Sequence, residues 1–401
     1  MTENPIFIKR KIDTKIQEYL KLPEILAIVG PRQSGKTTYL EHLIGEKGGR
    51  FISFEDVNTL NLFNNDIKKF IDTYLLDTDL LCIDEFQYAK AGGKNLKYIF
   101  DTYKGKKIII SGSSAIDITI HALKYLVGRV IVINFWPFDK DEIKTVFPHF
   151  TEKELYGYYA TYGGYPRVAI ASNNEERKVL LKNIYNTYFL REVKDILGLV
   201  DEYKIQKLLT YLAQSVGSNL SYTKLSNVCE LNQRDVRKYL EFMNKTFVVY
   251  LATPFFTNKL REIVKQPKAY FFDIGFLNHI LSYEVELGKK LEQVVAMELI
   301  KADLDIKYWR DKQNREMDFV VYKDNKIIAA IESKKGGKCT ESFNAFRKIY
   351  ANIMARIVTE DNVFRTVDLL KVNSATNSEY LETSPPSDTT PPSAPTGITV
   401  N

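Results

Sequence analysis

Apolar and polar positions in the first third of the chain alternate in two rhythms. Apolar runs that predict strands lie at 25–29, 50–54, 80–85, 107–110 and 128–135. Helical spacing precedes the first run and resumes after it from residue 37. Parallel strands need crossover connections, which are usually helices. The alternation therefore predicts an α/β domain built on a parallel sheet.

The rhythm changes after Trp136-Pro137-Phe138. Helical spacing then runs from Lys140 to about Leu209, interrupted by a turn at 162–167. This stretch is expected to form a helical lid or linker that follows the sheet domain.

A third pattern begins near residue 220. Two short helices, over 220–225 and 232–240, flank a tight turn, and two strands follow between 246 and 272. Helix, turn, helix and β-hairpin is the order of a winged helix. The second helix carries Gln233, Arg234, Arg237 and Lys238. These side chains suit nucleic-acid phosphates, but a winged helix can equally dock on protein, and the sequence leaves both alternatives open.

The last folded segment is a helix followed by strands. The helix is predicted over 291–299 and the strands at 307–310, 316–322 and 327–334, the last two forming a hairpin. Beyond Lys371 the chain becomes rich in Pro, Ser and Thr, as in Ser384 to Pro395. Such a composition cannot bury a core, so this tail is expected to be extended and disordered.

Length and composition narrow the class of protein. With 401 residues and 45% hydrophobic residues, the chain is long enough for two to four folded modules. Its net charge of +6 permits nucleic-acid binding without arguing for it. The three cysteines lie far apart and suggest neither a metal site nor disulfides. Without a signal-peptide pattern or a run long enough to span a bilayer, the sequence predicts a cytoplasmic protein with no membrane partner.

The most informative motif follows the first strand. Its residues fit G-x-x-x-x-G-K-[ST] at every fixed position, between a strand and a helix. Such a loop turns backbone N–H groups toward a polyphosphate. Lys36 would reach the outer phosphates, and the Thr37 hydroxyl would hold Mg²⁺. The predicted nucleotide-binding residues are Gly30, Pro31, Arg32, Gln33, Ser34, Gly35, Lys36, Thr37, Thr38 and Ser113.

Two carboxylates at the end of the third strand support this motif. Asp84 suits a water-mediated hold on Mg²⁺, and Glu85 suits polarising the water that attacks the terminal phosphate. The next strand ends in Ser111-Gly112-Ser113-Ser114. A small polar residue there, on a strand between the other two, could sense the γ-phosphate, although this composition is also common in loops.

A second candidate site lies in the C-terminal hairpin. Asp318 near the start of one strand and Glu332 near the end of the other can come close together. Glu332 and Lys334 are two residues apart and project from the same face. With Glu292 on the preceding helix, these carboxylates could bind a divalent metal, and Lys334 could stabilise a pentacovalent phosphate. The alternative is that they are ordinary surface residues at strand ends.

Together these motifs resemble a family of bacterial and archaeal ATPases of the AAA+ superfamily with a C-terminal DUF4143 domain. The resemblance runs from about Ile6 to about Leu370 and rests on combined motifs. They are 30–37, 81–87, 111–114, 126–129, 136–138, 163–166, 270–275, 316–318 and 332–334. The last part of the family looks like a PD-(D/E)XK nuclease fold. Ser333 departs from the β-branched residue usual between Glu and Lys, while both chemical groups remain.

The resemblance implies a fold class and a division of the chain into domains. The fold class is α/β: a P-loop NTPase parallel sheet with a helical lid, followed by winged-helix and PD-(D/E)XK nuclease-like α/β modules. The divisions are 1–135 for the ATPase domain, 136–210 for the lid, 211–284 for the winged helix, 285–372 for the nuclease-like domain and 373–401 for the tail.

The resemblance also implies a function. ATP and Mg²⁺ are the expected cofactors, and Arg129 becomes a candidate to contact the γ-phosphate within its own subunit or across an interface. A structural arginine at a domain edge is the alternative. The main hypothesis is an ATPase that drives a DNA-acting C-terminal region, with branched or duplex DNA and a second copy of the chain as candidate partners. The competing hypothesis is a nucleotide-dependent switch that recruits a protein through an inactive nuclease-like scaffold.

Overall fold

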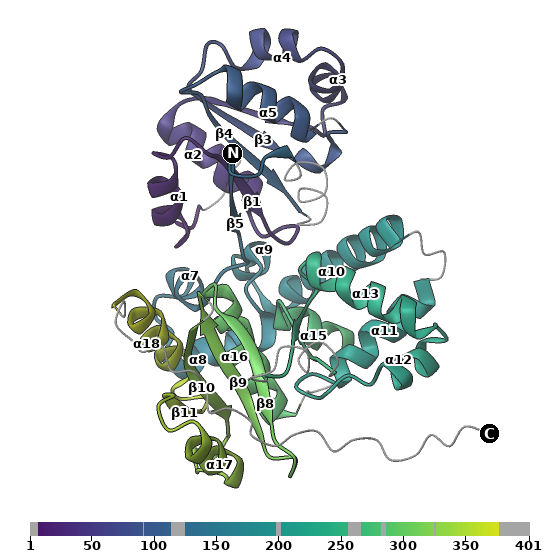
Figure 1. The fold of residues 1–401 in the computed structure, drawn as a ribbon, viewed down its shortest axis with the longest axis vertical. Coiled ribbons are helices and arrows are strands. Elements are labelled where there is room, and N and C mark those ends of the chain that lie inside the picture. The colour runs from purple at the N-terminus through teal and green to yellow at the C-terminus, as the bar shows by residue number, and fades with distance from the viewer. Residues whose placement is uncertain are drawn as a thin grey trace, which may run out of the picture.

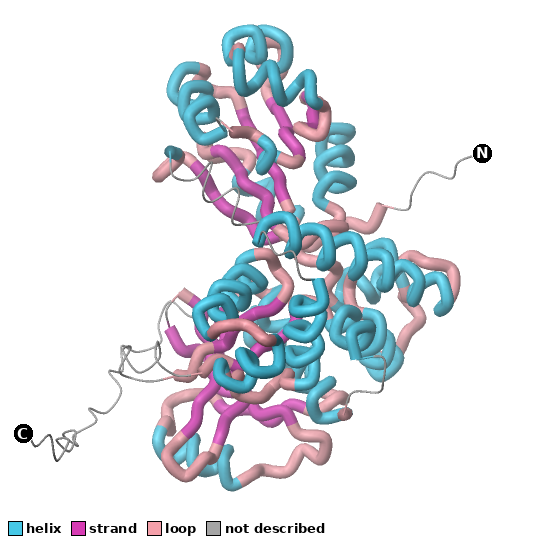
Figure 2. The backbone as a smooth tube through the Cα atoms, turned by 90° about the vertical axis from the view of Figure 1, so that its right-hand side faces the viewer, coloured by secondary structure: helices cyan, strands magenta, loops and turns pink. Residues whose placement is uncertain are grey.

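A computed structural model describes residues 7–90, 92–113, 125–197, 202–255, 266–281, 286–324 and 326–376. Figures 1 and 2 show two lobes that meet at a narrow waist. We refer to residues 7–135 as the N-terminal lobe and to residues 136–376 as the C-terminal lobe. The Pro-rich tail predicted to be disordered lies outside the described residues.

The N-terminal lobe is a three-layer α/β domain around a five-stranded sheet. Its strands are β1 (Ile25–Val29), β2 (Arg50–Ser53), β3 (Leu80–Asp84), β4 (Lys107–Gly112) and β5 (Val130–Asn134). All neighbouring pairs are parallel, in the order β2-β3-β4-β1-β5. The predicted fold class of this region is confirmed, and β4 lies between β3 and β1 as the phosphate-sensing hypothesis requires.

Helices cover both faces of this sheet (Figure 1). They are α1 (Asp13–Tyr19), α2 (Lys36–Lys47), α3 (Val57–Asn65), α4 (Ile67–Tyr74), α5 (Gly92–Thr102) and the 3₁₀ turn η1 (Phe86–Tyr88). Alternate residues of β1 enter different cores, as side chains of a strand must. Leu26 and Ile28 pack with Leu40 of α2, whereas Ala27 and Val29 belong to the core that contains Phe63 of α3. Burial on both faces explains the uninterrupted apolar run of β1.

The C-terminal lobe begins with helices. They are α7 (Lys140–Val146), α8 (Glu152–Tyr162), α9 (Pro166–Ala169), α10 (Asn174–Leu197), α11 (Glu202–Gln214), α12 (Tyr222–Cys229) and α13 (Gln233–Lys245). The antiparallel pair β6 (Val249–Ala252) and β7 (Lys268–Phe271) follows α13. These elements have the helix–helix–hairpin order predicted from the sequence. Their assignment as a winged helix stays a prediction.

The remaining elements surround a second sheet. They are α15 (Ile274–Leu281), α16 (Leu287–Lys301), β8 (Asp305–Arg310), β9 (Glu316–Lys323), β10 (Lys326–Ser333), α17 (Glu341–Ile349), β11 (Ala355–Val358) and α18 (Val363–Thr376). The sheet order is β11-β10-β9-β8, antiparallel except for the pair β10–β11. Val321 and Ile331 face the core that contains α16, whereas Val320 and Ala330 pack with Phe346 of α17.

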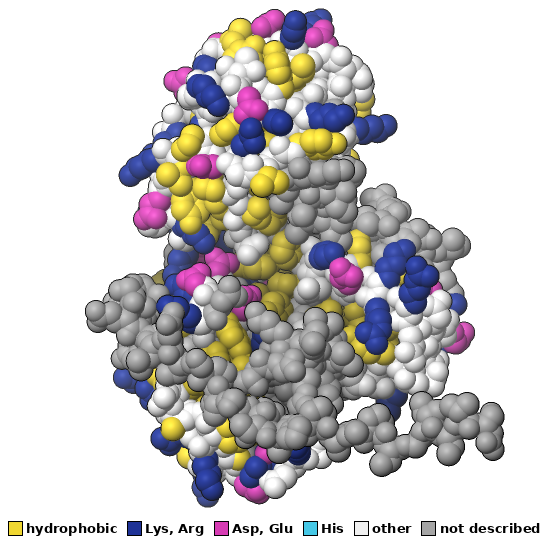
Figure 3. Space-filling view, viewed as in Figure 1, with side chains coloured by type: hydrophobic (Ala, Val, Ile, Leu, Met, Phe, Trp, Pro, Cys, Tyr) yellow, Lys and Arg dark blue, Asp and Glu magenta, His cyan; other side chains and the backbone are white. Residues whose placement is uncertain are grey.

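The surface of the described residues is mixed in charge. In the view of Figure 3, Lys and Arg side chains gather on the right of the C-terminal lobe, over the helices labelled α11 to α13 in Figure 1. No helix in the described part of the chain is both long and apolar enough to cross a membrane.

Candidate nucleotide site and its link to the C-terminal lobe

The phosphate loop occupies the carboxyl edge of the parallel sheet. It connects the end of β1 to the first turn of α2, and Gly35 caps that helix with a left-handed φ of 94°. A residue without Cβ adopts this conformation at little cost. Gly35 has no side chain that could cap the helix. The first amides of α2 therefore stay available to an anion, as at other helix N-termini. The loop predicted from the sequence therefore has the required strand–loop–helix context.

Lys36 lies folded over the loop. Its ammonium donates hydrogen bonds to the carbonyl oxygens of Gly30, at 2.9 Å, and Pro31, at 2.8 Å. The side chain is 6% exposed, so the charge is held at the loop itself and not in open solvent. Beneath the loop, Ser34 Oγ is buried and has no hydrogen-bond partner among the described residues. Both features fit a loop built to surround phosphate oxygens.

Thr37 and Asp84 come from different elements and meet beside the loop. Thr37 Oγ1 donates to Asp84 Oδ2 at 2.6 Å, and Ser111 donates to the other carboxylate oxygen. Oxygen ligands are those that Mg²⁺ prefers, and the structure brings this hydroxyl and this carboxylate together beside the loop. Their roles as a direct and a water-mediated partner of Mg²⁺ stay predictions.

Glu85 follows Asp84 in an unusual backbone conformation. Its φ of 52° lies in the left-handed region, which is uncommon for a residue with a Cβ. Gln87 donates to its carboxylate and reaches Ser113 Oγ at 3.5 Å. Burial and the neighbouring charge of Asp84 raise the pKa of Glu85. A half-buried carboxylate with a raised pKa at this edge suits a base that accepts a proton from water.

The structure does not bring Arg129 to the loop of its own chain. Its carbonyl accepts from the amide of Ile25, at the amino end of β1, whereas the phosphate loop follows the carboxyl end. Five strand residues separate these edges by about 16 Å. The guanidinium instead pairs with Asp101, at 2.9 and 3.3 Å. Arg129 therefore does not contact the phosphate loop of its own subunit in the described part of the chain, and a contact across an interface stays a prediction.

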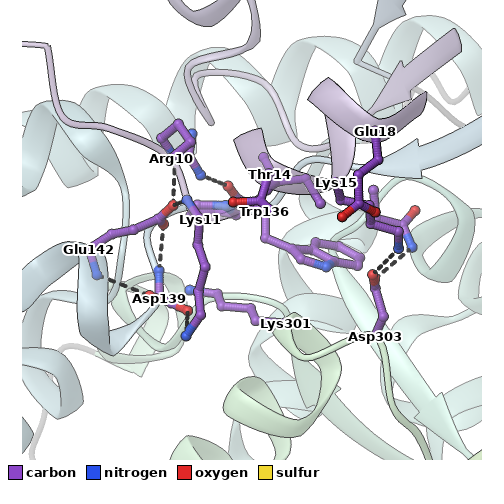
Figure 4. A pocket seen from close by; sticks show the side chains of 13 residues that line it. Arg10, Lys11, Thr14, Lys15, Glu18, Trp136, Asp139, Glu142, Lys301 and Asp303 are labelled. Atoms are coloured by element: carbon purple, nitrogen blue, oxygen red, sulfur yellow. Dashed lines mark hydrogen bonds and ion pairs between the residues drawn. The ribbon is translucent and has the colours of Figure 1, made fainter. Parts of the chain in front are cut away.

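Arg10 is a residue of this region that the sequence did not reveal. Its guanidinium donates to Ser34 O of the phosphate loop at 2.9 Å, to Trp136 O at 2.6 Å and to Glu142 Oε1 at 2.9 Å (Figure 4). Arg10 and Glu142 are 6% and 7% exposed, so this is a buried ion pair. One side chain therefore joins the phosphate loop to the first residue of the C-terminal lobe and to the first helix of that lobe.

The far side of this junction reaches α16. Lys301, near the end of that helix, donates to Phe138 O at 2.9 Å and to the Tyr159 hydroxyl at 2.8 Å. Its ammonium lies 3.8 Å from Asp273, which accepts from the amide of Gly164 at 2.8 Å. A methyl group on Gly164 would meet Phe138 O at 2.1 Å, so only glycine fits there. The motifs at 136–138, 163–166 and 270–275 thus meet at one place inside the C-terminal lobe, next to its junction with the N-terminal lobe.

A small cavity of about 280 Å³ opens beside Arg10 at this junction (Figure 4). Charged side chains of both signs line it, and its walls come from α1, the segment at 134–142 and the end of α16. The cavity therefore lies beside the polar contacts of Arg10, where the two lobes join.

The predicted metal site of the C-terminal hairpin is not assembled. Glu332 faces α17, where both of its oxygens accept from the Thr340 hydroxyl at 2.7 and 2.8 Å. Asp318 Oδ2 accepts from the amide of Ser333 at 2.7 Å. Among the described residues, no three His, Cys, Asp or Glu side chains are placed to hold a metal ion. Lys334 does lie beside Glu332, at 3.5 Å, as two residues on one strand face should.

Glu292 lies near enough to Asp318 for its charge to act on that carboxyl, but its direct partners are other residues. It accepts from the Tyr270 hydroxyl at 2.7 Å and pairs with Lys268 at 3.3 Å. A sequence signal for Lys268 does exist, because a single cation stands in front of the apolar run 269–272. Arg10 has no such signal, because its partners lie 24 to 132 residues away.

The parallel sheet, the phosphate loop and the paired carboxylates define a P-loop ATPase fold of the AAA class. Residues 22–144 match the AAA domain family, residues 287–377 match the DUF4143 family, and residues 153–286 match DUF8612, a domain of unknown function. The AAA and DUF4143 matches occur in the order that the resemblance implies, and they confirm it. The single match over 153–286 spans the predicted boundary at 210, and that division stays a prediction.

Relatives cover most of the chain at low identity. An uncharacterised protein of Methanocaldococcus jannaschii is 24% identical over 348 residues, 80% of this chain and 78% of the relative. An uncharacterised protein of Haemophilus influenzae is 22% identical over 80% of this chain and 84% of its own length. Among solved structures, the ORC2 protein of Aeropyrum pernix matches with a TM-score of 0.39 and 10% identity, over 67% of this chain and 89% of that one.

Proposed function

We propose that this protein binds and hydrolyses ATP with Mg²⁺ and that Arg10 passes the state of the phosphate loop to the C-terminal lobe. The meeting of Thr37 with Asp84 beside Lys36 is the observation that carries the first part. The contact of Arg10 with Ser34 O, Trp136 O and Glu142 carries the second.

Each residue of the site has a distinct task in this proposal. Lys36 and the first amides of α2 hold the phosphates, and Thr37 and Asp84 hold Mg²⁺. Bound Mg²⁺ supplies positive charge that neutralises the phosphate oxygens. Glu85 accepts a proton from the attacking water, and Gln87, whose amide contacts both Glu85 and Ser113, holds the Glu85 carboxylate in place. Positioning and charge do most of the work in phosphoryl transfer, which this arrangement of fixed groups suits.

In this proposal a single side chain, that of Arg10, connects the phosphate loop to the C-terminal lobe. A shift of the loop carbonyl at Ser34 acts directly on the Arg10 guanidinium, which is also bound to Glu142. Glu142 closes a capping box at the start of α7 by accepting from the amide of Asp139. Because a buried ion pair is costly to leave half-broken, a change at the loop favours movement of α7 with it.

Tryptophan fluorescence can test this link. The chain has two tryptophans, and Trp309→Phe would leave Trp136 as the only one. We expect Mg²⁺ and ATP to change Trp136 emission in that protein. Adding Arg10→Lys should weaken the change at least about twofold while ATP is still bound, because lysine cannot reproduce the three-way fork of arginine.

The matched control for this experiment is Arg50→Lys. Arg50 forms an ion pair with Asp77 in the same lobe but contacts neither the loop nor Trp136. An emission that does not respond to saturating ATP, or a response equally large with Arg10→Lys, would count against the proposed link.

DNA binding is a second candidate function of the C-terminal lobe. Helix α13 exposes Arg234, Arg237 and Lys238. Asn232 caps this helix and Arg237 stacks 4.0 Å over the Tyr222 ring of α12. Three cations on one exposed helix suit contact with phosphates.

Salt dependence distinguishes a DNA-binding α13 from a protein-docking one. We expect Arg234→Ala with Lys238→Ala to weaken binding to duplex and branched DNA and to lower the slope of log K against log salt by about 2, one for each phosphate that the variant no longer neutralises. Lys245→Ala, at the end of the same helix, serves as the control. An unchanged slope, or no binding by the parent protein at low salt, would favour the protein-docking alternative.

A further inference from the structure

A buried ion cluster lies where the sequence places a metal site. Lys268 of β7 is 1% exposed, and its ammonium lies 3.3 Å from Glu292 Oε1 and 2.5 Å from Glu316 Oε1. Asp318 is close enough that the charges of both Glu292 and Lys268 act on it. Two carboxylates, from α16 and β9, therefore pair with one internal lysine, and the Asp318 carboxyl lies within reach of their charges.

The described surroundings of this lysine close it off from solvent. A methyl group on Gly217 would meet Glu292 Oε2 at 2.5 Å, so the loop after α11 closes directly over that carboxylate. The Tyr308 ring lies 5.4 Å from the ammonium, and Tyr270 donates to Glu292 from the same strand as Lys268. Residues 217 and 268 both precede the DUF4143 match, so the cluster is covered by the domain in front of it.

The neighbouring carboxylates explain why the charged Lys268 is stable in this buried position. Burial alone would lower the pKa of Lys268, but the charges of Glu292 and Glu316 raise it above its ordinary value. Burial and the charge of Glu292 raise the pKa of Asp318 to about 7. A buried charge is stable only when it is paired, and here one ammonium serves several carboxylates at once.

We propose that Lys268 occupies the cation position of this cluster, so that the C-terminal domain carries an internal ammonium ion where a divalent metal would otherwise bind. Glu332, turned toward Thr340 on the other face of the sheet, takes no part. The domain then acts as a scaffold without metal-dependent cutting. This inference does not depend on ATP hydrolysis at the phosphate loop, so either proposal can fail alone.

Mn²⁺ binding tests the proposal in the full chain. Carboxylate oxygens bind Mn²⁺ well, and the loss of the free-ion signal in electron paramagnetic resonance counts the bound ions. The parent protein and Asp318→Asn should bind the same amount of Mn²⁺. Lys268→Met should bind about one extra ion per chain, and this gain should disappear when Asp318→Asn is added.

The control is Lys326→Met, which removes an exposed lysine of the hairpin and should leave Mn²⁺ binding unchanged. An Asp318-dependent Mn²⁺ ion in the parent protein would overturn the proposal. So would a folded Lys268→Met protein that gains no ion. If circular dichroism shows that Lys268→Met is unfolded, the comparison of the parent with Asp318→Asn still decides: equal binding supports the proposal and unequal binding overturns it.

Discussion

Replacing Lys36 with alanine is expected to lower the rate of ATP hydrolysis at least about 100-fold, the cost of losing one fixed charge that stabilises a transition state. ATP binding should weaken as well, because the Lys36 ammonium is the buried cation at the loop that holds Gly30 O and Pro31 O. Phosphate release measures the first effect, and titration with a fluorescent ATP analogue measures the second.

Lys47→Ala is the matched control for this variant. Lys47 is exposed at the other end of the same helix, α2, so its removal subtracts one positive charge without touching the loop. We expect it to bind and hydrolyse ATP like the parent protein. Equal activity of Lys36→Ala and the parent would contradict the assignment of the phosphate loop.

Glu85→Gln is expected to separate binding from hydrolysis. The amide keeps the size of the side chain but cannot accept the proton of the attacking water. Loss of a general base typically costs about 10²- to 10⁴-fold in rate, whereas ATP affinity should stay within about threefold. Glu41→Gln, an exposed position on α2, is the control. A Glu85→Gln protein that turns over ATP at the parent rate would show that Glu85 is not the base.

The pH profile of hydrolysis gives an independent check on Glu85. Burial and Asp84 raise its pKa above the ordinary 4.5, so Glu85 takes up a proton at a higher pH than an exposed glutamate would. Activity should therefore fall on the acid side of neutrality as this carboxylate is protonated. The residual activity of Glu85→Gln should lack that decline, and an identical acid limb in both proteins would assign it to another group.

The same shift predicts a small effect on stability. A carboxyl group whose folded-state pKa is raised is disfavoured in its charged form, so it destabilises the fold as pH rises through the window above 4.5. Glu85→Gln removes this cost. At neutral pH the variant should unfold at the parent temperature or slightly above it.

The nucleotide site was largely predictable from the sequence because its parts are local. A strand, a fixed loop and a helix start follow one another at 25–44, and the spacing alone specifies Lys36 and Thr37. Asp84 could be added because parallel strands bring their carboxyl ends to one edge of a sheet. The motifs also led us to expect β4 between β3 and β1, whereas the place of β5 at the edge beside β1 came from the structure.

The C-terminal candidate site was not predictable in the same way. Residues of a hairpin share a face only while the register is regular, and the pairing of β8 with β9 shifts between Lys307 and Trp309. Asp318 and Glu332 consequently have different partners, the Ser333 amide and Thr340. Lys268 reaches the cluster from another domain, a contact that no spacing along the chain encodes.

The two lobes differ in the chemistry of their charged groups. The N-terminal lobe presents an anion-binding loop, a hydroxyl–carboxylate pair and a half-buried carboxylate at one edge of a sheet. The C-terminal lobe instead uses its buried charges for internal ion pairs, those of Lys268 and Lys301. This contrast supports a nucleotide-driven switch more than a nuclease, with Arg10 as the proposed point of transmission.

Hydrogen–deuterium exchange of Glu85→Gln, with and without Mg²⁺ and ATP, tests this account most directly. The variant should hold ATP without turning it over, so the bound state lasts through the labelling. We predict altered exchange at residues 30–37 together with residues 136–146 and the end of α16 near Lys301. Altered exchange confined to the N-terminal lobe, with residues 136–146 and α16 unchanged, would contradict the proposed transmission.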